Sequence, residues 1–74
     1  MGNIPLGKVA AIRILIADEM GLNPEFATFA KMYLDGNLAP TQFAILERAG
    51  HDANKLINDS GRAQEALELA EKYL

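Results

Sequence analysis

The sequence of 74 residues contains no cysteine and a single histidine, His51. The absence of cysteine excludes disulfide bonds and thiolate metal ligands, and it leaves the redox compartment open. A zinc site would have to rely largely on carboxylates beside that one imidazole. The sequence therefore predicts no metal and no cofactor, so stability must come from packing or from association.

Basic residues are few and scattered, with seven Lys and Arg against ten Asp and Glu and a formal net charge of −3. Phosphate binding needs clustered Lys and Arg, so this balance argues against a nucleic-acid partner without excluding one. No segment approaches the roughly 18 continuous apolar residues of a membrane span. The most apolar segment is residues 9–17. It does not suit the core of a signal peptide, because it contains Arg13 and is followed directly by Asp18 and Glu19. The simplest expectation is a soluble cytoplasmic protein without a membrane partner.

Candidate catalytic residues are equally scarce. Ser60, Thr28 and Thr41 have no evident base partner, and the carboxylates lie in capping or solvent-facing patterns. A chain of this length has little room for a deep pocket once its core is filled. The sequence therefore predicts a protein that is not an enzyme.

Glycine and proline divide the chain into helical segments. The first runs from about Leu6 to Met20 and ends at Gly21. In the second, Asn23 can cap the helix and Pro24 suits its first position. The apolar residues that follow have the spacing of one buried face, and they are Phe26, Phe29, Ala30, Tyr33 and Leu34.

The second half of the chain predicts two or three further helices. One is expected from near Pro40 to Gly50, followed by a short turn and a brief helix that ends near Ile57. A last helix is expected from about Gly61 to the end of the chain. Its apolar side consists of Ala63, Ala66, Leu67, Ala70, Tyr73 and Leu74, and its polar side includes a favourable pair, Glu68 and Lys72. Together the segments predict an all-α fold, a compact bundle of four to five short helices that forms a single domain over residues 1–74.

The most apolar segment, residues 9–17, carries one charge and needs cover on more than one side. One helical stripe is typical of an ordinary core, and it consists of Val9, Ile12, Ile16 and Met20. Ile14 falls on nearly the opposite side with Ala10 and Ala17, whose small side chains would let another helix approach closely. A central helix of the monomer, an interface helix and a strand all remain open for this segment, because β-branched residues also suit strands.

The preferred hypothesis is a non-catalytic protein–protein interaction or assembly module that forms a homo-oligomer through the apolar first helix. Each helix is expected to bury one apolar stripe in the core. The apolar residues that remain outside these stripes indicate the partner surface. With Arg13, they form the candidate partner-binding set: Ala10, Arg13, Ile14, Ala17, Met32 and Leu69. Arg13 buried in such an interface would need a carboxylate from a neighbouring chain, such as Asp18 or Glu19.

The alternative hypothesis starts from residues 38–56. This segment resembles the helix-turn-helix of phage-repressor-type regulators, in which a glycine starts the turn. The resemblance is carried by L-A-P-T-Q at residues 38–42, E-R-A-G at residues 47–50 and the residues from Asp52 to Leu56. The resemblance implies a small DNA-binding regulator that uses the corner from Thr41 to Lys55. Gly50 would then be the turn glycine, and Ala53, Asn54 and Lys55 would face DNA.

Overall fold

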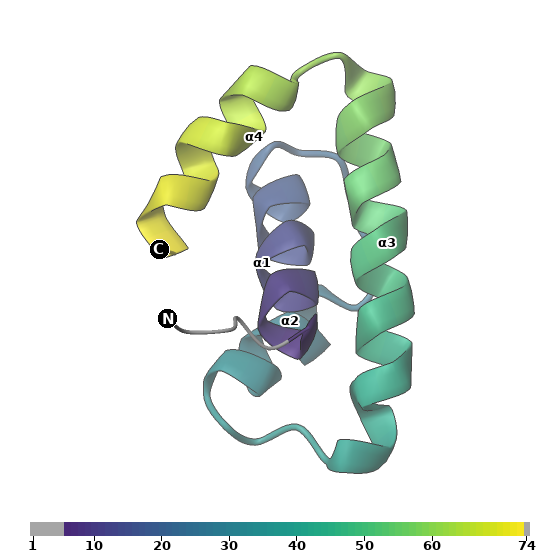
Figure 1. Ribbon diagram of the computed structural model, residues 1–74. Coiled ribbons are helices and arrows are strands. Elements are labelled where there is room, and N and C mark those ends of the chain that lie inside the picture. Colours follow the sequence, from purple (N-terminus) through teal and green to yellow (C-terminus); the bar gives the residue numbers. More distant parts are fainter. Residues whose placement is uncertain (1–5, 74) are drawn as a thin grey trace.

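In the computed structural model, which describes residues 6–73, the chain folds into four α-helices and two short 3₁₀ helices (Figure 1). These helical residues make up 79% of the described part, which contains no strand. The prediction of an all-α bundle is confirmed, with four α-helices. The strand interpretation of residues 9–17 is wrong, because the whole segment lies within one helix.

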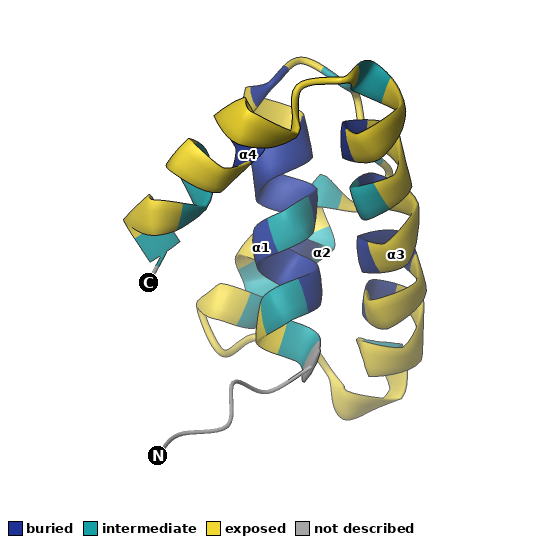
Figure 2. Cartoon of the chain, turned by 45° about the horizontal axis from the view of Figure 1, so that its top comes forward, coloured by how far each residue is buried: buried dark blue, intermediate teal, exposed yellow. Residues whose placement is uncertain are grey.

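Helix α1 (Leu6–Glu19) is the centre of the fold and contacts each of the other three α-helices. Its bounds agree with the prediction to within one residue, and Gly21 follows it in the left-handed conformation, with φ of 76°. Figure 2 shows α1 buried along much of its length, while the outer sides of α3 and α4 are exposed. A helix surrounded in this way has to be apolar on more than one side, which explains its composition.

Helix α2 (Ala27–Leu34) begins three residues later than predicted, so Asn23 and Pro24 do not cap or start it. Phe26 precedes the helix in the left-handed conformation, with φ of 62°, which is strained for a bulky side chain. The middle of the predicted buried face is kept, because Phe29 and Tyr33 pack against the core beside Ala30. Within α2 only Ala30 is buried, whereas Phe26 and Leu34 are exposed.

Helix α3 (Phe43–Ser60) follows a 3₁₀ helix (Pro40–Gln42) and runs without a break through Gly50. The predicted turn after Gly50 is wrong. The glycine serves a close helix crossing instead, because a Cβ atom added to it would lie 2.5 Å from the Ala10 Cβ atom of α1. The helix-turn-helix corner is therefore not formed in this chain.

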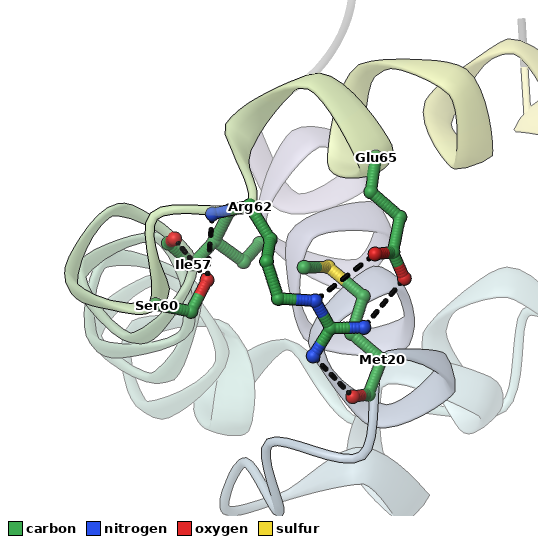
Figure 3. Close-up of polar contacts among 5 residues, drawn as sticks. All are labelled: Met20, Ile57, Ser60, Arg62 and Glu65. Atoms are coloured by element: carbon green, nitrogen blue, oxygen red, sulfur yellow. Dashed lines mark hydrogen bonds and ion pairs between the residues drawn. The ribbon is translucent and has the colours of Figure 1, made fainter.

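Helix α4 (Ala63–Ala70) continues into a second 3₁₀ helix (Glu71–Tyr73) and leaves α3 through a tight corner at Gly61. Ser60 Oγ donates to the Ile57 carbonyl oxygen at 2.6 Å and accepts from the Arg62 backbone N–H at 3.1 Å (Figure 3). These bonds satisfy backbone groups at the helix end. Leu74, assigned to the buried face of this helix, lies outside the described residues.

Candidate interaction groove

The face of α1 that the sequence singled out as unexplained is covered within the same chain. Ile14 and Ala17 are 0% exposed and Ala10 is 4% exposed. Ala10 meets Gly50 of α3, and the three residues share one side of α1 because they are spaced four and three apart. The prediction that they form an exposed partner surface is therefore wrong for the folded chain.

The opposite stripe of α1 borders an apolar groove between α1, α3 and α4. The groove has a volume of about 240 Å³. It is lined by Val9, Ile12, Arg13 and Ile16 of α1, Asn54 and Ile57 of α3, and Ala66, Leu67 and Ala70 of α4. We call this feature the apolar groove. The sequence assigned the stripe of α1 that borders it to the core, and Ile12, Ile16 and Met20 are buried as predicted. Both stripes of α1 are therefore covered within the chain, and Val9 is the one member of the predicted core stripe that is partly exposed.

The floor and the rim of the apolar groove differ in exposure. Ile12, Ile16 and Ile57 form a floor that is at most 8% exposed. On the rim, Leu67 is 64% exposed, more than any other large apolar side chain described. The sequence placed Leu67 on the buried side of its helix beside Ala66. Consecutive residues lie about 100° apart around a helix, so burial of Ala66 leaves Leu67 at the edge.

Two polar side chains stand on the same rim, Arg13 and Asn54, and both are partly buried. Arg13 also borders a smaller hollow of about 50 Å³ beside Glu47 and His51. Among residues 6–73, no side-chain hydrogen bond or ion pair reaches Arg13. The groove therefore combines an apolar floor with a cation that has no partner in the described part of the chain.

Polar contacts fix the start of α4 to the end of α1. Arg62 Nη1 donates to the Met20 carbonyl oxygen at 3.1 Å (Figure 3). The same guanidinium group binds both carboxylate oxygens of Glu65, at 2.9 and 2.6 Å, and these hydrogen bonds lower the pKa of Glu65. A cation is favourable beside the last carbonyl groups of a helix. Arg62 thus helps to hold the α4 wall of the groove in place.

The far end of α4 is fixed to the same part of α1. Glu19 accepts hydrogen bonds from Lys72 Nζ and from Tyr73 Oη, the latter at 3.0 Å. The bond from Lys72 is the main cause that lowers the pKa of Glu19, and burial opposes it. Burial, followed by the bond to Glu19, raises the pKa of Tyr73, which keeps its hydroxyl a donor at neutral pH. The sequence predicted that Lys72 pairs with Glu68. Lys72 instead pairs across the fold with Glu19.

We expect the Glu19→Gln substitution to lower thermal stability slightly at neutral pH. The folded-state pKa of Glu19 lies below its ordinary value of 4.5, so folding favours the ionised form. Its contribution is fully present above pH 4.5 and is lost as the pH falls through the folded-state value. The difference in melting temperature between wild type and variant, followed by circular dichroism, should shrink on acidification below pH 4.5.

Asp18→Asn is the matched control for that measurement. Asp18 is the neighbouring exposed carboxylate, and no side-chain hydrogen bond or ion pair reaches it within the described range. A pH-dependent difference of the same size in both variants would contradict a specific role for Glu19.

The remaining residues singled out by the sequence lie apart from one another. Met32 and Leu69 are half-buried and pack against the core. Ala53 is 1% exposed, so it cannot contact DNA from the folded chain. Asn54 lines the apolar groove, and Lys55 borders a separate open hollow. The sequence therefore identified Arg13 on the groove rim but missed Leu67 and the apolar floor.

Residues 6–73 were also compared with the requirements of a metal site and of a membrane-spanning helix. No three histidine or carboxylate side chains in this range are placed together so that they could hold a metal ion. None of the described helices has the length and apolar character needed to cross a membrane.

Comparison of the chain with protein-family models, with curated proteins and with solved structures found no match. The functional argument therefore rests on the residues of the apolar groove.

Proposed function

We propose that this protein is a non-catalytic helical assembly module that self-associates through the apolar groove, with a second copy of the chain as its partner. The observation that supports the proposal is the position of an exposed leucine, Leu67, on the rim of a groove with an apolar floor. Complete burial of such a side chain contributes about 2 kcal/mol. Self-association therefore still involves the apolar first helix, through Val9, Ile12 and Ile16.

A second copy fits this groove because one chain carries both complementary parts. In a two-fold symmetric dimer, the same patch on each copy contacts its equivalent. Leu67 of each copy can then enter the groove of the other, so both leucines and both grooves are covered at once. A partner with only one such feature would leave either Leu67 or the groove exposed.

The size of the molecule is compatible with such a contact. A specific interface needs about 1,000 Å² of total buried surface, or about 500 Å² from each copy. The chain exposes 4924 Å² and is flattened, with principal extents of 33 × 30 × 16 Å. A contact of about 500 Å² from each copy is about a tenth of that exposed surface, so the expected dimer is modest in size.

We expect Leu67→Glu to abolish self-association while the chain stays folded. The leucine is already exposed in the single chain, so its loss removes little intramolecular packing, whereas a carboxylate would oppose burial in the second copy. Sedimentation equilibrium from low to high micromolar concentration measures the effect, and circular dichroism checks the fold.

Ile45→Glu is the matched control, because Ile45 is 43% exposed on α3 and does not line the groove. This variant should associate like wild type. A wild-type chain that stays strictly monomeric at high micromolar concentration would rule out the proposed function. Equal loss of association in both variants would rule out the groove as the contact surface.

A cytoplasmic location belongs to the same proposal. It is supported by Arg13 and the Asp18-Glu19 pair, which interrupt the apolar run of the first helix. A fluorescent fusion recovered with the membrane or extracellular fraction of cells would contradict it.

A further inference from the structure

The charged side chains around the apolar groove indicate how a second copy would be oriented. Arg13 stands on the groove wall nearest α3, where it also borders the hollow with Glu47 and His51. Glu71 is exposed and lies four residues after Leu67, so the two share one side of the helical segment. Glu68 directly follows Leu67 and points about 100° away from it. Glu71 is therefore the carboxylate placed to accompany Leu67 into a groove.

Other carboxylates near α4 are already in use. Glu65 pairs with Arg62, and Glu19 pairs with Lys72. Within residues 6–73, no side-chain hydrogen bond or ion pair reaches Glu71 or Arg13. Arg13 lines the groove, and Glu71 lies one helical turn beyond the rim residue Leu67 on the same side of the segment. Both are therefore available to a second copy.

We propose that two copies associate antiparallel about a two-fold axis, with Arg13 of each copy paired with Glu71 of the other. This inference rests on the proposed self-association and specifies its orientation. In Figure 1, α4 begins beside the end of α3 and runs away from it. A two-fold axis perpendicular to α4 reverses that direction, which is what makes the arrangement antiparallel, so the second copy's α4 ends toward α3 of the first. Glu71 of the second copy then approaches Arg13.

The two ion pairs fix orientation more than they add affinity. Charge complementarity at a contact disfavours arrangements that bring like charges together, while an exposed pair contributes little by itself. Because of the symmetry, the pair occurs twice in each dimer, and reversal of one charge creates two like-charge contacts. We therefore expect Arg13→Glu and Glu71→Arg each to weaken self-association about tenfold or more.

Mixing the two variants provides the decisive experiment. The Arg13→Glu copy carries carboxylates at both positions, and the Glu71→Arg copy carries guanidinium groups at both. Neither variant should pair with itself, but a mixed dimer restores both opposite-charge contacts. Sedimentation equilibrium of the full-length chains, alone and in equimolar mixture, should show dimers only in the mixture. An intramolecular effect of either substitution on folding would not be rescued by mixing.

Glu68→Arg is the control with the same change of charge as Glu71→Arg. It should self-associate like wild type, so its mixture with Arg13→Glu will contain Glu68→Arg homodimers. A mixed dimer of these two variants keeps one like-charge contact, so a fluorescently labelled Arg13→Glu copy should enter dimers less with Glu68→Arg than with Glu71→Arg. If wild type dimerises and the mixture of Arg13→Glu with Glu71→Arg stays monomeric, the inferred orientation is wrong and the proposed function stands. If wild type itself is monomeric, both are wrong.

Discussion

The Ile14→Glu variant is expected to be unfolded at neutral pH. Ile14 is 0% exposed and is one of the two largest fully buried side chains described, and no charged side chain is buried in that part of the chain. A carboxylate at this position would lose its hydration without gaining a partner, at a cost of several kcal/mol in addition to the lost packing. A domain of this kind has a total stability of about 5–10 kcal/mol, so this cost removes most or all of it.

Circular dichroism and thermal melting measure this effect, with Ile14→Ala as the graded comparison. The alanine variant loses packing without burying a charge, so it should lower stability by about 2–5 kcal/mol. Leu67→Glu places the same carboxylate on the exposed rim and should keep its helical content. An Ile14→Glu chain that still melts cooperatively but no longer self-associates would instead put Ile14 at an interface, as the sequence hypothesis had it.

The end of the first helix could be predicted from sequence because it depends on local chemistry, whereas the start of α2 and the continuation of α3 through Gly50 could not. Gly21 was expected to end the first helix, and it adopts a φ of 76° just after α1. Gly61 was expected to begin the last helix, and it instead closes α3 with a φ of 71°. Glycine tolerates this conformation wherever the rest of the chain lies. The class of fold followed from the same local signals.

The orientation of α1 could not be predicted in this way. Both of its stripes are apolar, so helical periodicity gives no preference between the side of Ile14 and the side of Ile12. The choice depends on which stripe has the shape to receive α3. Ala10 and Gly50 supply that shape together, and they are forty residues apart in the sequence. Only the tertiary contact reveals the match.

The apolar groove was missed for a related reason. The sequence interpretation assigned the stripe of Val9, Ile12 and Ile16 to the core and so treated it as fully covered. In the structure, α4 packs over only part of α1. Arg62 contacts Met20 and Lys72 contacts Glu19, so both ends of α4 are fixed near the C-terminal end of α1. The rest of α1 is left without cover from α4. No local pattern predicts such long-range contacts. Arg13 could be identified because a lone charge in an apolar run is visible in the sequence itself.

Gly50→Ala is expected to destabilise the fold, although alanine favours an exposed helix interior over glycine by about 1 kcal/mol. The added Cβ atom would lie 2.5 Å from Ala10 Cβ and 2.6 Å from Ala10 Cα. The second contact involves the backbone, so no side-chain rotation can relieve it and α1 and α3 have to separate. Such overpacking costs about 1–3 kcal/mol, and the larger Gly50→Val should cost more.

The double variant Gly50→Ala with Ala10→Gly separates close packing from turn formation. If the helices cross at this pair, removal of the Ala10 methyl group should recover part of the stability lost in Gly50→Ala, measured by urea unfolding. If Gly50 instead started a turn, the alanine would still destabilise, because that conformation suits glycine, but Ala10→Gly would give no recovery. The sign of the coupling between two residues forty positions apart therefore distinguishes a continuous α3 from a helix-turn-helix corner.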